Sequence, residues 1–328
     1  MSIAELYRKL KQILNYSNEA LISKGLNPVN SLNELFLEIN NKINRLPYLA
    51  SRSIIKASEN DFYNITNVGD YAFFNCNNLK SVTIPNNIIT IGNSAFYNCS
   101  NLTNVIIGDD TASIKNYAFN HCESLTDITI PNSVTNIGLG AFKWCKNLKS
   151  ITIPFIGSSR TANEQPDATF GYIFDYMSTS HDDRVIQFYS DNVAHFKYYF
   201  IPSSICSVTI TDTEIIPYGA FYNCGNITNI ELPSNLTSIS TKAFYRCSKL
   251  TNITIPDKVV SIGRDAFGSC TEMSDIYLKP VIPPTLGATN AIPSGTTIHV
   301  PVGSGEAYKS ATNWSNHAKY IVEDIVIE

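Results

Sequence analysis

Apolar and polar positions recur in a fixed order along most of this chain. Residues 81–99, SVTIPNNIITIGNSAFYNC, show the unit, whose general form is L-x-x-V-x-I-P-x-x-V-x-x-I-G-x-x-A-F-x-x-C. The Ala-Phe pair of the unit begins at Ala72, Ala95, Ala118, Ala141, Ala220, Ala243 and Ala266, and within each block the step is 23 residues. A constant period of this length predicts a solenoid of stacked coils, each of which contributes one short strand.

The V-x-I signature of the unit places ten strands along the chain. They are expected at residues 82–84, 105–107, 128–130, 151–153, 186–188, 208–210, 230–232, 253–255, 276–278 and 298–300. Because side chains alternate along a strand, the two flanking residues of each signature point inward and the middle residue points outward. We expect each strand to pair in parallel with the strands of the neighbouring coils. One coil, between Ile153 and Ile186, is about a dozen residues longer than the others.

Three other positions of the unit also have physical roles. Gly92, Gly138 and Gly263 are expected to allow a turn with positive φ, and the Phe of each Ala-Phe pair is expected to fill the core. Seven of the eight cysteines occupy one repeat position, and only Cys206 lies elsewhere. Equivalent side chains in stacked coils point in parallel, which favours buried free thiols over disulfides.

The combined I-P, I-G, A-F and Cys positions resemble those of the BspA-type leucine-rich-repeat family, over residues 64–324. This resemblance implies a leucine-rich-repeat solenoid with a period of about 23 residues. It also implies a parallel sheet on the concave face and recognition or adhesion at bacterial surfaces, usually without catalysis. Tyr308 and Trp314, together with Val300-Pro301, resemble the closing module of the same family.

The sequence predicts three regions. They are an N-terminal helical cap or anchor at residues 1–50, the solenoid at 51–300 with its expanded coil at 154–202, and a C-terminal cap at 301–328. Apolar residues at helical spacing predict one helix near the start, and a capping-box pattern predicts a second from Ser31.

The predicted helices of residues 1–50 have two interpretations. They could cover the first coil, or they could form an anchor or self-assembly segment. The first interpretation is favoured, and the reason for the second is that two helices with apolar faces are more than one lid requires. Residues 20–25 and the helix from Ser31 also have a weak resemblance to the helical leaders of prophage-encoded tail proteins. Ile54 and Ile55 are expected to form a first strand before the repeats.

The expanded coil is the least regular stretch and is rich in aromatic residues. Insertions in repeat proteins often form the binding face, but these rings are also suited to packing against the solenoid. Both interpretations stay open, with packing favoured. The segment His181-Asp182-Asp183 and His195 offer too few ligands for a metal site, so a solvated polar loop is expected there.

Composition and charge restrict the classes of partner. The chain of 328 residues has a net charge of -4, and charged residues make up only 16% of it. There is no basic cluster of the kind that nucleic-acid binding requires, so no nucleic-acid partner is expected. The chain contains no run of about 18 apolar residues, so membrane insertion is not expected. The first residues also lack the pattern of a secretory signal. An extracellular, cell-surface or virion location is the expectation.

The candidate binding residues lie on the outward side of the predicted strands in the second half of the chain. The middle residues of the signatures there are Gln187, Thr209, Glu231, Thr254, Tyr277 and His299, and a neighbouring row contains Asn229, Asn252 and Asp275. Polar but largely uncharged side chains suit a protein or glycan partner. However, Thr on the exposed side of a strand is also simply a good strand former.

An enzymatic function is not expected. None of the five histidines lies beside a nucleophile in a recognisable motif, and no phosphate-binding or dinucleotide-binding loop is present. We therefore expect no catalytic residue, no cofactor and no metal. Two functions remain: recognition of a host protein or glycan on a bacterial surface or phage particle, and a structural role in which the solenoid is a rigid spacer.

Overall fold

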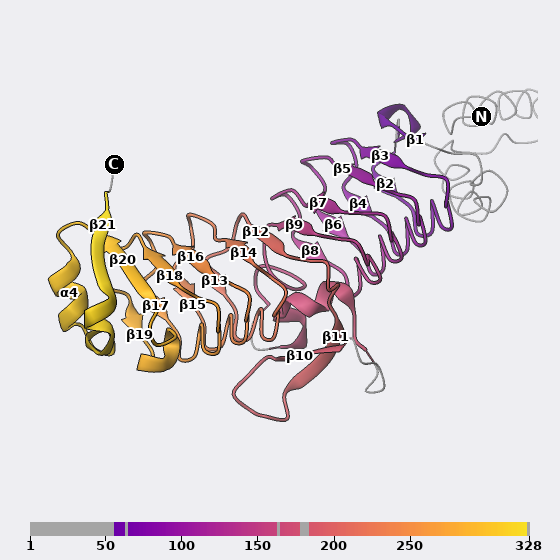
Figure 1. Ribbon diagram of the computed structural model, residues 1–328. Helices are drawn as coiled ribbons and strands as arrows, with labels where there is room; N and C mark the ends of the chain where they lie inside the picture. Colours follow the sequence, from indigo (N-terminus) through magenta and orange to yellow (C-terminus); the bar gives the residue numbers. More distant parts are fainter. Residues whose placement is uncertain (1–55, 63–64, 163–164, 178–183, 327–328) are drawn as a thin grey trace, which may run out of the picture.

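The computed structural model describes residues 56–62, 65–162, 165–177 and 184–326. Figure 1 shows these residues as an elongated solenoid of stacked coils, with two rows of strands running along its length. The repeat solenoid that the sequence predicts is therefore confirmed. The predicted helices of residues 1–50, the strand at Ile54 and Ile55, and the segment His181-Asp182-Asp183 lie outside the described residues.

The first row of strands follows the V-x-I signatures. It consists of three parallel sheets in succession. The first contains β1 (Lys56–Ala57), β3 (Ser81–Ile84) and β5 (Asn104–Ile107). The second contains β7 (Asp127–Thr129), β9 (Ser150–Ile153), β12 (Ser207–Ile210) and β14 (Asn229–Glu231), and the third contains β16 (Asn252–Ile255), β18 (Asp275–Leu278), β20 (Thr297–Pro301) and β21 (Ile321–Ile325). Equivalent positions pair, as Val82 does with Val105. The register therefore places identical repeat positions on top of one another.

A second row of two-residue strands runs beside the first (Figure 1). Its members are β2 (Asn67–Val68), β4 (Thr90–Ile91), β6 (Ser113–Ile114) and β8 (Asn136–Ile137), followed by β13 (Ile215–Ile216), β15 (Ser238–Ile239), β17 (Ser261–Ile262) and β19 (Thr285–Leu286). In each of these two-residue strands the second residue is buried, for example Ile91 and Ile262. The sequence indicates these inward residues, but the strand pairing between them was not predicted.

The core between the two rows contains a column of stacked rings. The Phe73 and Phe96 rings lie 4.9 Å apart and nearly parallel, and the Phe96 and Phe119 rings lie 5.1 Å apart. A second column contains Phe221, Phe244 and Phe267, with centroid separations of 5.5 and 5.1 Å. The prediction that the repeated Phe fills the core is confirmed, and the stacking fixes the spacing of the coils.

The repeated cysteines are buried beside this column. All eight cysteines lie among the described residues and none is in a disulfide; seven are buried, and Cys206 is partly exposed. The Cys145 thiol donates to the carbonyl oxygen of Phe119 at 3.2 Å, and the Cys270 thiol donates to that of Phe244 at 3.1 Å. Burial raises the pKa of both Cys145 and Cys270 to about 12. The prediction of buried free thiols is confirmed.

The role predicted for the repeated glycines is wrong. Gly92, Gly138 and Gly263 do not have positive φ. A Cβ at Gly92 would lie 2.7 Å from the backbone nitrogen of Asp70 in the preceding coil. Glycine is therefore needed because two backbones approach closely here. Positive φ occurs instead at two other positions of the repeated unit, the residue before the Ala-Phe pair and the residue before the Cys. Examples are Ser94 (52°) and Asn98 (56°).

The expanded coil departs from the predicted ladder. β10 (Arg184–Phe188) and β11 (Phe196–Phe200) form an antiparallel hairpin, while β9 pairs directly with β12. The predicted strand at residues 186–188 exists, but it belongs to the hairpin and not to the parallel row. The 3-10 helices η3 (Pro166–Ala168) and η4 (Phe170–Phe174) continue the stack instead.

η4 connects the coils on either side of the expanded coil. The backbone nitrogen of Phe142 donates to the carbonyl oxygen of Ile173 at 2.8 Å, and that of Phe170 donates to the carbonyl oxygen of Ala220, also at 2.8 Å. Phe170, Phe174 and Tyr199 are fully buried. The favoured interpretation, that most rings of this coil pack against the solenoid, is confirmed for these residues.

The two described ends of the solenoid differ. At the first end, the 3-10 helix η2 (Glu59–Phe62) precedes the repeats. At the last end, α4 (Gly305–Ser310), η6 (Trp314–Tyr320) and β21 follow the short helix η5 (Thr289–Ala291). Tyr308 and Trp314 are fully buried, and the Trp314 indole donates to the carbonyl oxygen of Pro284 at 2.7 Å. Two large rings thus cover the last coil, and β21 adds a parallel strand that was not predicted.

Candidate functional site

The outward side chains of the first strand row form one continuous surface, which we call the ladder face. Thr209 pairs in register with Glu231, Thr254 with Tyr277, and Tyr277 with His299. Asn252 pairs with Asp275 in the neighbouring row, and Asn229 occupies the equivalent position on β14. The structure therefore brings eight of the nine sequence-predicted binding residues onto this face.

Gln187 is the exception, and its predicted place on the ladder face is wrong. Its side chain is completely buried between the hairpin and the next coil. Its Nε2 donates to the carbonyl oxygen of Tyr222 at 3.2 Å, and its Oε1 accepts from the backbone nitrogen of Gly171 at 2.7 Å. Gln187 holds the hairpin against the coils, because its amide satisfies backbone groups that would otherwise be buried without partners.

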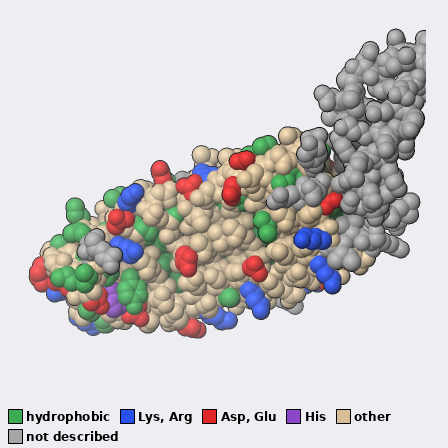
Figure 2. Space-filling view, turned by 90° about the horizontal axis from the view of Figure 1, so that it is seen from above, with side chains coloured by type: hydrophobic (Ala, Val, Ile, Leu, Met, Phe, Trp, Pro, Cys, Tyr) green, Lys and Arg blue, Asp and Glu red, His purple; other side chains and the backbone are tan. Residues whose placement is uncertain are grey.

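Most of the ladder face is polar and uncharged. The face viewed from above in Figure 2 consists mainly of uncharged polar side chains and backbone, with acidic and basic side chains scattered over it. The Thr209 hydroxyl donates to Glu231 at 3.2 Å, and the Asn229 amide donates to the Ser207 hydroxyl, also at 3.2 Å. These contacts align donors and acceptors between coils, so the face offers hydrogen-bonding groups at regular intervals.

The last coils add a cluster with a different character, which we call the His299 cluster: Asp275, Tyr277, His299 and Asp324. The His299 Nδ1 lies 2.7 Å from Asp324, and its Nε2 lies 3.0 Å from Asp275. The imidazole stacks on the Tyr277 ring at a centroid distance of 4.3 Å. Tyr277 remains 36% exposed. The cluster thus presents a partly exposed aromatic ring that stacks on an imidazole, and two carboxylates hold that imidazole in place.

Electrostatics in the His299 cluster favour the charged histidine. Burial lowers the pKa of His299, but the hydrogen bonds to Asp275 and Asp324 outweigh it and hold the pKa above its ordinary value. Hydrogen bonds from Ser274 and His299 lower the pKa of Asp275. Because both imidazole nitrogens face carboxylates, His299 is engaged in an ion-pair network. The sequence did not indicate that Asp324 belongs to this cluster. The only feature that could have pointed to it is the group of apolar residues around it, at 321, 322 and 325.

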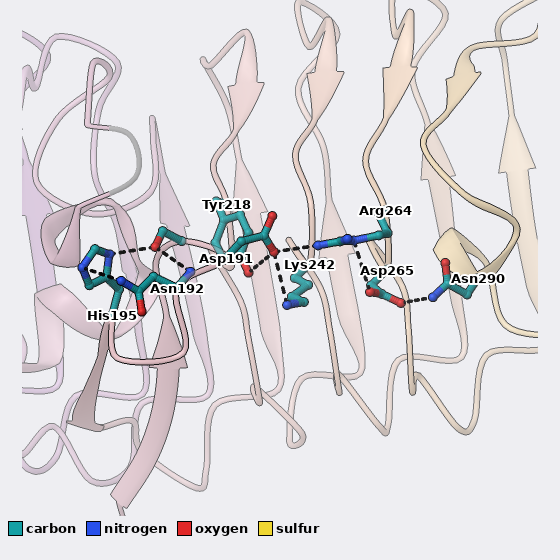
Figure 3. A network of polar contacts seen from close by, with 9 residues as sticks. Asp191, Asn192, His195, Tyr218, Lys242, Arg264, Asp265 and Asn290 are labelled. Carbon is teal, nitrogen blue, oxygen red and sulfur yellow. Dashed lines mark hydrogen bonds and ion pairs between the residues drawn. The ribbon is translucent and has the colours of Figure 1, made fainter.

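A second polar network fixes the hairpin on the flank of the solenoid (Figure 3). Asp191, near the hairpin tip, accepts from the Tyr218 hydroxyl at 3.1 Å, from Lys242 at 3.4 Å and from Arg264 at 2.8 Å. These three partners come from successive coils. His195 lies in the same loop, with its Nδ1 2.8 Å from the Ser190 hydroxyl.

Two further kinds of site are absent from the described residues. No group of three or more His, Cys, Asp or Glu side chains has the arrangement of a metal site there. In the same part of the chain, no helix has both the length and the apolar character that crossing a bilayer requires.

Several solved structures are similar to this chain over most of its length. A T. pallidum leucine-rich-repeat protein is 17% identical with a TM-score of 0.30, and the match covers 74% of this chain and 79% of that one. A Bacteroides ovatus leucine-rich-repeat protein is 19% identical with a TM-score of 0.31, over 80% and 88%. The pneumococcal vaccine antigen PcpA is 17% identical with a TM-score of 0.31, over 84% and 78%.

The family comparison is more specific. None of the curated proteins compared matches this chain. The sequence profile described as the BspA type leucine rich repeat region matches six copies, over residues 53–163 and 196–284. These residues make up more than half of the chain and contain both columns of stacked Phe rings. The chain therefore belongs to the BspA-type leucine-rich-repeat family.

Proposed function

We propose that this protein is a non-enzymatic recognition protein of a bacterial surface or phage particle, and that it binds a host protein or glycan through the ladder face. The observation that carries the proposal is the alignment of outward side chains in two successive sheets. Thr209 pairs with Glu231 in one, and Thr254 pairs with the exposed Tyr277, which pairs with His299, in the next. Family membership supports a surface location, and the geometry supports the choice of face.

The chemistry of the ladder face favours a glycan or a polar protein surface. Hydroxyl and amide groups at regular spacing can pair with the hydroxyls of a sugar chain or with polar groups of a protein. An aromatic ring that is exposed yet fixed in position, as Tyr277 is, supplies contact area at low entropic cost. The sparse charge leaves little attraction for a polyanion such as nucleic acid.

Glu231 and His299 each have hydrogen-bond partners on this face, which supports binding over catalysis. Glu231 accepts a hydrogen bond from Thr209, and His299 lies between Asp275 and Asp324. A general acid or base needs access to a substrate proton. The proposal therefore assigns Glu231, Tyr277 and His299 to partner contact.

The test is the binding of purified protein to cultured epithelial cells and to a panel of immobilised glycans. A variant carrying Glu231→Gln, Tyr277→Ser and His299→Gln is expected to lose at least about tenfold in affinity, because contacts at the centre of an interface dominate its energy. A control carrying Glu214→Gln and Val260→Ala, both exposed outside the ladder face, should bind normally. Unchanged binding by the triple variant, with circular dichroism confirming its fold, would refute the assignment.

The second candidate function is a structural role in a surface assembly or virion. It is favoured by the uninterrupted core from Phe73 to Trp314, which makes the described coils a continuous rod suited to act as a spacer. In this case assembly would depend on the predicted N-terminal helices. Deleting residues 1–50 should then convert an oligomer into a monomer in analytical ultracentrifugation, whereas a monomer before and after deletion would count against the spacer.

A further inference from the structure

Two turns near the end of the solenoid expose aliphatic side chains. Val281 and Ile282 follow β18 and are 56% and 81% exposed, and Val302 follows β20 and is 65% exposed. β18 and β20 are paired neighbours in the same sheet, so the two turns belong to successive coils (Figure 1). We call Val281, Ile282 and Val302 the aliphatic edge.

The corresponding turns of earlier coils are polar. The turns after β3, β5 and β16 expose Asn86-Asn87, Asp109-Asp110 and Asp257-Lys258, respectively. Polar residues are sufficient for such turns, because their short side chains can hydrogen-bond to the turn backbone. The aliphatic edge is therefore not required by the repeat. Neighbouring exposed apolar side chains with a polar rim are typical of a contact surface.

Hydrogen bonds hold both turns in place. The Tyr308 hydroxyl donates to the carbonyl oxygen of Pro280 at 2.7 Å, and the Ser304 hydroxyl donates to that of Pro301 at 2.6 Å. Each of these prolines lies directly before a residue of the aliphatic edge. A partner would therefore meet a preformed surface and would lose little free energy in ordering it.

Charges of opposite sign lie on the two sides of the aliphatic edge. Lys279 is exposed directly after β18, whereas Glu306 lies on α4, beyond the last of these turns, with a side chain that is 89% exposed. Glu306 contacts Lys309 at 3.1 Å, but an exposed ion pair of this kind contributes little and leaves the carboxylate able to pair with another cation. Asp257 and Lys258 in the preceding turn carry opposite charges and add no net charge. The order along the edge is therefore basic, aliphatic, acidic.

This order makes the surface complementary to itself. When two copies meet about a twofold axis through the aliphatic edge, Lys279 of each copy faces Glu306 of the other. We propose that the aliphatic edge pairs two copies of this chain in this way. Removal of the aliphatic side chains from water supplies the attraction, and the two ion pairs fix the orientation. A membrane of anionic lipids would accept the aliphatic side chains but would repel Glu306.

The proposed pairing is separate from the ladder face. The aliphatic edge lies in the turns after the strands, whereas the ladder-face residues point outward from the strands themselves. A pair of chains would carry two ladder faces, so it could hold a repetitive ligand at two points. Because the contact is small, we expect a weak dimer that dissociates on dilution.

Sedimentation velocity of the full chain at increasing concentration measures the pairing. Ile282→Asp places a charge in the contact and should raise the dissociation constant of the dimer at least about tenfold. Val193→Asp is the matched control, because Val193 is also 81% exposed but lies at the tip of the hairpin, and it should leave the constant unchanged. Lys279→Glu and Glu306→Lys should each weaken the dimer. The double variant should recover the native constant to within about threefold, since it restores opposite charges across the contact.

Cross-linking identifies the contact even if the predicted N-terminal helices also associate. In a Cys206→Ser background, a short bismaleimide should link copies that carry Ile282→Cys and should not link copies that carry Val193→Cys. The proposal is overturned if the full chain stays monomeric at every concentration, or if Ile282→Asp and Val193→Asp dimerise equally. It is also overturned if the double charge variant pairs no better than the single ones, or if both cysteine variants are linked equally. Binding to vesicles of anionic lipid that Ile282→Asp abolishes, without self-association, would assign this surface to a membrane instead.

Discussion

At the scale of single residues, the repeated glycine shows how contact between coils limits the side chain. The position of Gly92 has ordinary φ, yet a Cβ there would meet the backbone of Gly69 and Asp70 at 2.7 Å. The sequence indicates that glycine is required, but it cannot distinguish a turn from a close approach. That distinction depends on the neighbouring coil, which is 23 residues away in the chain.

Replacing Gly92 tests this close approach. Gly92→Ala should lower the free energy of unfolding by about 1 to 3 kcal/mol, because one of two packed backbones must move. Gly225→Ala is the matched control, since its Cβ would closely approach the Ser248 hydroxyl at 3.0 Å, which can rotate away, and would be in ordinary contact with the Arg246 carbonyl oxygen at 3.8 Å. Its effect should stay within about 0.5 kcal/mol. Urea unfolding measures both, and equal effects would contradict the close-approach explanation.

His299 predicts a pH dependence of stability. Its pKa in the folded protein is raised above the ordinary value of 6.5, so folding favours the protonated form. The stabilisation is fully present below pH 6.5 and is lost as the pH rises through the raised value. The difference in unfolding free energy between the native protein and His299→Gln should therefore be larger at pH 5.5 than at pH 8.5. A difference that is constant, or larger at pH 8.5, would contradict the proposed ion pairs.

Gln187 shows where local pattern fails at this scale. Residues 186–188 fit the V-x-I signature, and successive side chains of a strand point to opposite sides, but in β10 only the middle residue, Gln187, is buried. However, the same alternation occurs in a parallel row and in an antiparallel hairpin. Only the pairing partner decides between them, and here that partner is β11, the next strand in the chain. The middle residue therefore points into a buried site and not onto the ladder face.

At the scale of elements, the hairpin is the main addition to the repeated coil. The sequence predicts its location because one coil is longer, and its aromatic residues suggest packing. The antiparallel pairing, the role of η4 and the attachment of the tip to later coils could not be predicted. They depend on contacts between residues far apart in the chain, such as Asp191 and Arg264.

Asp191 tests how the hairpin is held. Asp191→Asn should loosen the attachment of the hairpin tip to Lys242 and Arg264. Amide hydrogen exchange in β10 and β11 should then become up to about fivefold faster, because partly exposed ion pairs contribute little free energy. Exchange in β14 and β16 should not change. Asp257→Asn, at an exposed position in a coil turn, is the control. Faster exchange throughout the solenoid, or none in the hairpin, would contradict a local attachment.

At the scale of the whole molecule, the period predicted the fold because each coil repeats one set of inward side chains. Stacking is then the only way to bury every set, so the sequence determined the solenoid, the Phe columns and the buried thiols. The ladder face followed directly from alternation, with eight of its nine proposed residues placed there. The His299 cluster did not follow, because β21 and Asp324 lie beyond the last repeat.

If the ladder face contacts the partner, as proposed, a bulky group attached to that face should block binding. In a Cys206→Ser background, the remaining thiols are buried, so a maleimide-polyethylene glycol should react only with an introduced cysteine. Attachment at Thr254→Cys, on the ladder face, should reduce binding to epithelial cells at least about tenfold by steric exclusion from the interface. Attachment at Val260→Cys, 67% exposed outside that face, should leave binding intact. Equal binding by both conjugates, or loss only at position 260, would contradict the claim.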